Sequence, residues 1–317
     1  MYPLLFSQNR KTLVWGTEDW IVSGIPGSES VISHGPHTGM LLTDYIAGNP
    51  AAILGHRISA QFGGKMPLLV KIIDARQDLS IQVHPDDEMA RRVHGKMGKS
   101  EMWYILSAEP GAFLYAGFSK QITPDEYRAR VADITITEVL ARHEVHPGDV
   151  FYLPAGRVHA IGGGIRLAEV QQSSDITYRI YDYGRPGLDG KPRELHTELA
   201  AQAIDYSVLP SYRTDYELRR NHAETILDTS FFSVTTSSLT GPIHRRLLRH
   251  DSFVICVALR GNVRIKLRNA PTDLNEAVLR EGQACFIPAA VADYDLEPMI
   301  LPPDLTLTSP TIMEAYI

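Results

Sequence analysis

Three short segments carry side chains that commonly bind divalent metal ions. The first holds Gln82 and His84, the second holds Glu101, and the third holds His159. Gln82 and His84 are two residues apart on an apolar, extended stretch, so both side chains project from the same face of a strand. Two imidazoles, a carboxylate and an amide oxygen suit zinc, and the two histidines with the carboxylate also suit ferrous iron. If these segments meet inside one barrel, the sequence predicts a metal site.

The turn before His159 is the most specific of these motifs. Gly148 is followed by Pro154, Gly156 and then His159, and this spacing is similar to the second metal-binding signature of cupin barrels. Each other candidate has an ordinary structural interpretation when taken alone. A histidine beside proline is typical of a turn, a glutamate at a strand start is typical of an exposed end, and a glutamine in an apolar run is typical of a hydrogen-bonded core amide. The metal-site hypothesis therefore depends on the whole set.

The elements that would position these residues are mostly short strands. Apolar runs of four to eight residues recur between Gly, Pro, Asp and Asn, which is the pattern of a mainly β protein. Examples are 68–73, 103–106, 150–153 and 253–259. Acidic first turns and a capping Thr123 predict a smaller number of helices. We expect these helices over 85–93, 124–131, 133–142 and 194–206.

One sequence phrase occurs twice and predicts an internal duplication. Residues 145–155 and 279–289 both read as a turn, a glycine, a polar residue, an apolar run, proline and alanine. A similar apolar strand precedes each copy, so we expect two cupin-like jelly-roll β-barrel domains with a small helical segment. The catalytic metal-binding domain would cover 1–210 and a second cupin-like domain 227–317. Asp293 stands in the second copy where His159 stands in the first, so the second domain is predicted to have no metal site.

Composition excludes several classes of partner. The formal net charge is −6 and the longest basic cluster is the short run 244–246, so nucleic acid is not an expected partner. No apolar run approaches the roughly 18 residues of a membrane-spanning helix. The two cysteines, Cys256 and Cys285, lie inside apolar runs and are expected to be buried thiols in a reducing compartment. We expect a soluble cytoplasmic protein, with no protein partner evident.

At this point the sequence resembles a known family, the type I mannose-6-phosphate isomerases, in the form of its short bacterial members. The resemblance is dense between residues 68 and 185 and thinner elsewhere. The matching segments are 79–87, 99–104, 154–160 and 169–185, together with Trp15, Gly16 and Trp20. One position departs from the family pattern: Ile161, two residues after His159, stands where an aromatic residue near the sugar is common. That departure concerns how the rim of the pocket contacts the sugar.

The resemblance implies an enzyme, a zinc-dependent aldose–ketose isomerase. It would interconvert D-mannose 6-phosphate and D-fructose 6-phosphate through an enediol or enediolate, with one Zn²⁺ per chain and a small sugar phosphate as partner. By position, the family's zinc ligands fall on Gln82, His84, Glu101 and His159. Its active-site arginine falls on Arg179, and its other substrate-facing positions fall on Ser80, Lys71, Lys99, Glu169 and Arg185.

The chemistry of isomerisation assigns roles to these residues. A base must remove and return a proton between C1 and C2, and Glu169 and Lys99 are the two candidates, with Glu169 preferred. Arg179 would hold the oxygens on which negative charge develops. Arg185, Lys71 and Ser80 would bind the phosphate.

Two other functions fit the same ligand set. A non-catalytic cupin that binds metal and a sugar phosphate would need no base. A metal-dependent cupin oxygenase would not need a glutamine ligand or a phosphate-binding set.

Overall fold

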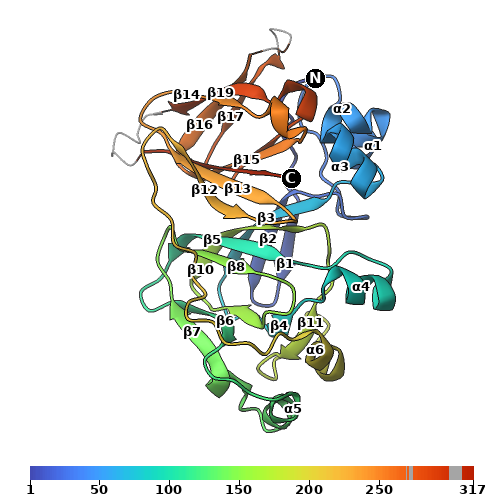
Figure 1. The fold of residues 1–317 in the computed structure, drawn as a ribbon, viewed down its shortest axis with the longest axis vertical. Helices are drawn as coiled ribbons and strands as arrows, with labels where there is room; N and C mark the ends of the chain where they lie inside the picture. The colour runs from blue at the N-terminus through green and yellow to red at the C-terminus, as the bar shows by residue number, and fades with distance from the viewer. Residues whose placement is uncertain (269, 271–273, 300–308) are drawn as a thin grey trace. The chain divides into compact units, whose positions relative to one another are not determined.

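The fold is mainly β, as the sequence predicts, and is built from antiparallel sheets (Figure 1). The computed structural model describes residues 1–268, 270, 274–299 and 309–317. The first sheet has the order β1 (Arg10–Leu13), β2 (Gly16–Val22), β3 (Leu68–Ala75), β10 (Ile165–Gln172), β5 (Glu101–Ala108), β8 (Val150–Leu153). The second has the order β11 (Tyr178–Tyr181), β4 (Ile81–Val83), β9 (His159–Ile161), β6 (Phe113–Phe118), β7 (Leu140–Glu144).

The C-terminal part of the chain forms a second pair of sheets. One has the order β12 (Ala223–Asp228), β13 (Ser233–Ser238), β20 (Thr311–Tyr316), β15 (Val254–Arg260), β18 (Ala284–Ile287). The other has the order β14 (Ile243–Arg246), β19 (Asp293–Met299), β16 (Asn262–Leu267), β17 (Glu276–Leu279).

Strand order repeats between the two pairs of sheets. The order β2-β3-β10-β5-β8 corresponds to β12-β13-β20-β15-β18, and β4-β9-β6-β7 corresponds to β14-β19-β16-β17. The ladders match in register as well, because Glu101 pairs with Leu153 in one copy and Val254 pairs with Ile287 in the other. This agreement supports the duplication predicted from the repeated phrase, and the two-sheet units are cupin-like.

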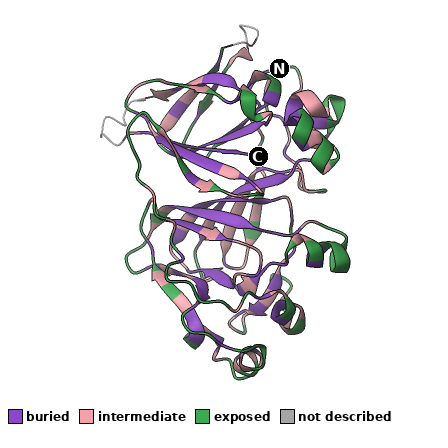
Figure 2. Cartoon of the chain, in the orientation of Figure 1, coloured by how far each residue is buried: buried purple, intermediate pink, exposed green. Residues whose placement is uncertain are grey.

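Each pair of sheets encloses a cluster of buried apolar side chains, and most of the strand residues are coloured as buried in Figure 2. In the N-terminal pair, Ile105 and Leu167 of the first sheet share a buried cluster with Leu114 and Ile161 of the second. In the C-terminal pair the equivalent cluster includes both cysteines, Cys256 and Cys285, which are free and fully buried. The expectation of buried thiols is confirmed.

Of the four helices predicted from the sequence, three are present with somewhat different bounds and one is absent. Helix α4 (Asp87–His94) is capped by Asp86, whose carboxylate accepts a hydrogen bond from the Met89 amide. Helix α5 (Pro124–Ala132) is capped by Thr123. The helix predicted over 194–206 is shorter, because α6 spans Thr197–Ala203. The helix predicted over 133–142 is wrong: a 3₁₀ turn, η1 (Ile136–Val139), leads directly into strand β7.

Three helices near the N-terminus are absent from the predicted set. They are α1 (Leu42–Gly48), α2 (Pro50–Leu54) and α3 (His56–Phe62). Asn49 and Pro50 stand at the start of α2, and the Asn49 side chain accepts the Ala52 amide. This cap followed by proline is a helix-start signal that the sequence offered. Two further 3₁₀ turns are η2 (Leu248–His250) and η4 (Ala289–Val291).

The chain divides into two compact units, each drawn from separate segments. Unit 1 comprises 1–9, 20–70 and 215–317, and unit 2 comprises 10–19 and 71–214. Residues 1–9 and 20–70 group with the C-terminal segment because Leu4 bridges to Phe286 and the Asp251 carboxylate accepts the first amides of α3. All ten site residues predicted from the sequence lie in unit 2. The assignment of 1–210 and 227–317 as functional domains stays a prediction.

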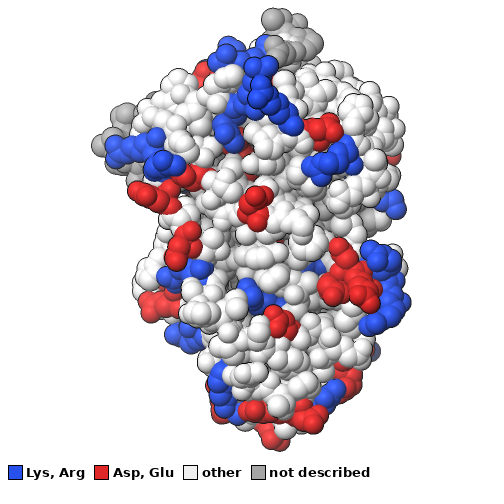
Figure 3. Space-filling model, in the orientation of Figure 1, with Lys and Arg blue, Asp and Glu red and all other residues white. Residues whose placement is uncertain are grey.

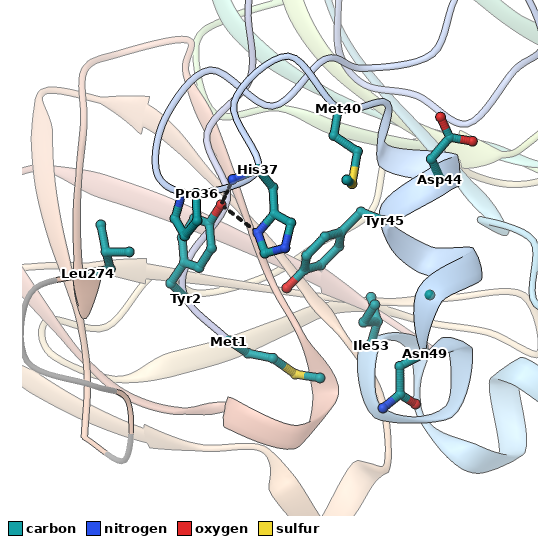
Figure 4. A pocket seen from close by; sticks show the side chains of 11 residues that line it. Met1, Tyr2, Pro36, His37, Met40, Asp44, Tyr45, Asn49, Ile53 and Leu274 are labelled. Atoms are coloured by element: carbon teal, nitrogen blue, oxygen red, sulfur yellow. Dashed lines mark hydrogen bonds between the residues drawn. The ribbon is translucent and has the colours of Figure 1, made fainter.

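Unit 1 contains an apolar pocket of about 590 Å³. Tyr2, His37 and Tyr45 form its aromatic part, and the Tyr2 hydroxyl contacts the His37 amide and ring nitrogen (Figure 4). Leu274, which follows residues outside the described part of the chain, completes one wall.

The surface carries charges of both signs on the same face (Figure 3). Many are paired, as Arg128 is with Glu198 and Arg268 with Asp295. Within the described residues no helix is long and apolar enough to cross a membrane.

Candidate metal centre and active site

Three predicted metal ligands meet inside unit 2. The ligand atoms of His84, Glu101 and His159 all lie within 4.8 Å of one another, and all three residues are at most 1% exposed. Glu101 Oε2 is 3.4 Å from His84 Nε2, and Glu101 Oε1 is 3.2 Å from His159 Nε2. Among the described residues, His84 Nε2 and Glu101 Oε1 have no hydrogen-bond partner, and Glu101 Oε2 has only the Lys99 ammonium. Buried polar atoms are normally satisfied, so this convergence fits a cation held between them.

Local structure explains why these residues meet. His84 follows β4, Glu101 opens β5, and His159 opens β9. The amide of Gly156 donates to the His84 carbonyl, which joins the turn before His159 to the end of β4. Gly156 has a φ of +88°, a conformation that favours glycine. His159 shares a face of β9 with Ile161, which belongs to the core between the sheets, so the His159 imidazole faces the interior.

Both imidazoles are held in the tautomer that metal binding requires. His84 Nδ1 lies 2.9 Å from the Ile176 carbonyl, and His159 Nδ1 lies 2.7 Å from the Arg157 carbonyl. A carbonyl only accepts hydrogen bonds, so each Nδ1 carries the proton and each Nε2 keeps its lone pair. Backbone carbonyls commonly orient metal-bound histidines in this way.

The pKa shifts of His84, His159 and Glu101 favour the protonation states that bind a cation. Burial, with the positive charge of Lys99, lowers the pKa of His84 to about 3, so its imidazole is neutral at physiological pH. Burial also lowers the pKa of His159. Burial alone would raise the pKa of Glu101, but Lys99 and the two histidines outweigh it and hold this pKa well below its usual range. Two neutral imidazoles and one carboxylate are therefore available as ligands.

Gln82 lies beside this cluster. It pairs with His159 across β4 and β9, and its Nε2 is 3.3 Å from His159 Nε2. The side-chain amide of Gln82 can be rotated by 180°, which exchanges its oxygen and its nitrogen. The rotated placement presents the amide oxygen toward the same point as the three ligand atoms. The structure thus brings all four predicted ligands together.

Glu169 and Lys71 form a buried ion pair on neighbouring strands. Lys71 Nζ is 2.9 Å from Glu169 Oε1 and 3.7 Å from Glu18 Oε2, and both members of the closer pair are almost fully buried. Burial would lower the pKa of Lys71, but Glu169 and Glu18 outweigh it and raise the pKa. Lys71 is therefore a fixed cation. The structure places it against the preferred base, an environment that the sequence did not indicate.

Lys99, the other candidate base, lies against the metal ligands. Its Nζ is 2.8 Å from Glu101 Oε2, and its side chain is 6% exposed. An ammonium in contact with the Glu101 carboxylate is a hydrogen-bond donor, not an acceptor. This position suits a group that gives a proton or steadies negative charge, and Glu169 suits the role of acceptor better.

Arg179 lies on the same sheet face as two of the ligands. It pairs with Gln82 across β11 and β4, and Gln82 in turn pairs with His159. Neighbours in register share a face, so the guanidinium projects on the side of the metal cluster. One of its terminal nitrogens donates to the Glu194 carbonyl, and its Nε is buried without a hydrogen-bond partner among the described residues. Burial and nearby Arg193 lower the pKa of Arg179.

Arg185 belongs to a cluster that the sequence did not reveal in full. Its Nε donates to Asp182 Oδ1 at 3.0 Å, and Arg193 holds both Asp182 oxygens at 2.6 Å. Burial would raise the pKa of Asp182, but the two arginines outweigh it and lower the pKa. Arg179 lies within electrostatic reach of this cluster and of Glu194, so three arginines and two carboxylates leave net positive charge. Ser80, the remaining predicted substrate residue, is 3% exposed and immediately precedes β4.

Trp103, Asp182 and Arg193 are the polar residues of this site that sequence reasoning missed. Trp103 lies two residues after Glu101 on β5, and Glu169 stands opposite Trp103 on β10. The alternation of a strand, applied to Glu101, would have placed Trp103 on the ligand face. No sequence spacing connects Asp182 with Arg193, because the turn between them is irregular.

In the described part of the C-terminal copy, the equivalent positions do not carry this ligand set. When the two copies are aligned by the pairing of their strands, Val254 stands where Glu101 stands in the first copy. In the same way Arg246 replaces Gln82, and Asp293 replaces His159. Asp293 contacts His244 at 2.6 Å. Within the described residues, His84, Glu101 and His159 form the only group of three that could hold a metal ion.

The chain is similar to known proteins of one family. A model of the phosphomannose isomerase type I catalytic domain matches residues 15–107. The chain is 33% identical over 282 residues to mannose-6-phosphate isomerase ManA of Bacillus subtilis, an alignment that covers 83% of this chain and 87% of the relative. It is 33% identical over 284 residues to the mannose-6-phosphate isomerase of Streptococcus mutans, covering 88% and 85%.

A solved structure agrees with these relatives. The crystal structure of the mannose 6-phosphate isomerase from Bacillus subtilis superposes with a TM-score of 0.84 at 27% identity, and all of both chains is covered. Identity of one third over most of both chains, together with the shared fold, establishes common family membership. The chain is an isomerase that belongs to the type I mannose-6-phosphate isomerase family.

Proposed function

We propose that this isomerase interconverts D-mannose 6-phosphate and D-fructose 6-phosphate, using one zinc ion per chain and an enediolate intermediate. One observation carries the proposal: His84, Glu101 and His159 direct their ligand atoms to one buried point, where His84 Nε2 and Glu101 Oε1 have no hydrogen-bond partner among the described residues. The names of the curated relatives supply the substrate pair. A purely binding protein would not need a buried base, so the catalytic reading is preferred to the binding one.

The donor set supports zinc. Two neutral imidazoles, a carboxylate and an amide oxygen match the ligands that zinc accepts, and the Ile176 and Arg157 carbonyls orient the two histidines. When bound, a divalent cation acts as a Lewis acid that stabilises negative charge developing on sugar oxygens. Zinc adds no redox chemistry of its own, which suits a reaction that only relocates a proton.

The chain's own residues provide the proton transfer. Glu169 would take the proton from C2 of the open-chain aldose and return it to C1. Arg179 would donate hydrogen bonds to the oxygens that become negative, and Lys99 would steady the same region with its ammonium. Burial of Glu169, Lys99 and the metal ligands excludes water, which limits loss of the proton to solvent.

The phosphate would bind at the far end of the sugar. Arg179, Arg185 and Arg193 together outnumber the two carboxylates near them, Asp182 and Glu194. A phosphate dianion would balance this charge through charge-assisted hydrogen bonds. Ser80 and Lys71 stay predicted contributors, although Lys71 already contacts two carboxylates. We also propose a cytoplasmic location, and no protein partner is expected.

Substrate identity can be tested by a coupled assay. We expect the purified protein to form fructose 6-phosphate from mannose 6-phosphate with a kcat in the common range of about 1–10³ s⁻¹. Glucose 6-phosphate, the C2 epimer, should give far less product because its C2 proton lies on the other face. Equal turnover of both epimers, or none with mannose 6-phosphate in zinc-loaded protein, would contradict the proposal.

Arg185→Gln is expected to weaken phosphate binding selectively. Loss of one charge-assisted hydrogen bond should raise KM for mannose 6-phosphate by about 10- to 100-fold. Any slow turnover of unphosphorylated mannose should be unchanged. Steady-state kinetics on both sugars measures this split, and Arg128→Gln, an exposed arginine paired with Glu198, is the matched control. Equal losses on both sugars would remove Arg185 from the phosphate site.

Lys71→Met is a useful comparison in the same assay. If Lys71 binds phosphate, its loss should affect only the phosphorylated sugar. If it mainly holds Glu169, the loss should fall equally on both sugars.

A further inference from the structure

Trp103 occupies an unusual position between the predicted base and a predicted metal ligand. It is 0% exposed, lies two residues after Glu101 on β5, and pairs in register with Glu169 on β10. Residues two apart on a strand share a face, so Trp103 points to the same interior as Glu101. Its cross-strand neighbour Glu169 projects on that face as well.

The indole nitrogen holds one oxygen of Glu169. Trp103 Nε1 donates a hydrogen bond of 2.9 Å to Glu169 Oε2, while Lys71 lies 2.9 Å from Oε1. An indole N–H can only donate, so it constrains the carboxylate without competing for its proton. With one donor on each oxygen, the plane of the carboxylate is fixed. Lone pairs on both oxygens remain for a substrate proton, since a carboxylate accepts about four hydrogen bonds.

The ring of the same tryptophan contacts a metal ligand. The Trp103 and His159 rings meet edge to face, with centroids 5.3 Å apart and planes at 84°. The Arg157 carbonyl fixes which His159 nitrogen is protonated. The indole then limits rotation of the imidazole. Trp103 therefore contacts both the predicted base, Glu169, and a predicted metal ligand, His159. The relative position of these two groups determines how far the proton must move.

We propose that Trp103 is a positioning residue, which sets the Glu169 carboxylate relative to the metal centre through its N–H and its ring. The proposal rests on the proposed function, because it takes Glu169 as the base. Proton transfer is sensitive to small changes of donor–acceptor geometry. Removal of the N–H alone leaves Lys71 as the remaining partner of Glu169 among the described residues, and the carboxylate can then turn away from C2.

The decisive variant replaces Trp103 with 3-benzothienylalanine, which keeps the two-ring shape and substitutes sulfur for N–H. Trp103→Phe is the genetically encoded companion. We expect kcat to fall about 10- to 100-fold, with zinc content and KM unchanged. The primary isotope effect on kcat with mannose 6-phosphate deuterated at C2 should increase, because proton transfer becomes slower than the other steps. A variant that merely folds less well would lower activity without changing the isotope effect.

The outcomes separate this proposal from the function on which it rests. If Glu169→Gln abolishes turnover while the benzothienyl variant keeps the wild-type kcat and isotope effect, the role of Trp103 is overturned and the base assignment survives. If zinc is lost from the benzothienyl variant, the residue acts on the metal centre alone and the proposal also fails. If Glu169→Gln itself retains full turnover, the base assignment fails first.

Discussion

Glu169→Gln is expected to lower kcat by about 10²- to 10⁴-fold, the usual contribution of a positioned base. The substitution keeps the shape of the side chain and can still accept the Trp103 hydrogen bond. The amide cannot take a proton from carbon at physiological pH, so catalysis should fail while substrate still binds. Kinetics with mannose 6-phosphate, combined with metal analysis by mass spectrometry, should show the loss at normal zinc content.

The controls for this experiment come from the same chain. Glu198→Gln changes an exposed glutamate that pairs with Arg128, and it should leave turnover unchanged. Lys99→Met tests the competing base. Wild-type kcat in Glu169→Gln, with a large loss in Lys99→Met, would transfer the role to Lys99. That result would give the Lys99 ammonium a more active part than its contact with Glu101 suggests.

Metal removal is the second change with a large expected effect. Dialysis against a chelator should lower turnover by at least about 10³-fold, since a Lewis acid commonly contributes several kcal/mol at about 1.36 kcal/mol per decade. Zinc should restore activity. Tm should also fall, because bound metal stabilises the folded state and its loss leaves His84 Nε2 and Glu101 Oε1 buried without a hydrogen-bond partner among the described residues. Activity and thermal unfolding, measured before and after reloading, test both expectations.

His159→Ala should reproduce the chelated state in a form that zinc cannot rescue. His146→Ala is the matched control, because His146 is exposed and lies in the turn before β8. Full turnover by protein shown to be free of metal would contradict the proposed mechanism. A strict requirement for ferrous iron with consumption of oxygen would instead favour the oxygenase alternative.

Local sequence patterns were sufficient to predict whether most segments form a helix or a strand. They failed where pairing with a distant strand determined the secondary structure. The strands around Gly148 and Gly282 could be predicted because a glycine turn, an apolar run and a proline are local signals. The segment 133–142 was predicted as helix from its composition. In the structure residues 136–139 form a 3₁₀ turn, and residues 140–142 belong to strand β7, which pairs with β6. Sheet pairing with a distant strand overrides helix propensity in such a segment.

The sequence by itself determined which residues could bind a metal. Ligand chemistry is set by side-chain type, and strand alternation already placed Gln82 and His84 on one face. The repeated phrase likewise indicated two related β units, because a turn and strand of fixed length recur in both.

Only the tertiary structure decided what each site residue contacts. From the sequence, Lys71 could be a strand-edge lysine or a phosphate ligand, yet the pairing of β3 with β10 places it against Glu169. Trp103 reads as a core aromatic, yet its N–H reaches the same carboxylate. These contacts join residues 66 or more positions apart, and burial makes them strong because the low-dielectric interior does not screen them. Pairing across strands is set by the fold as a whole, so no local spacing encodes it.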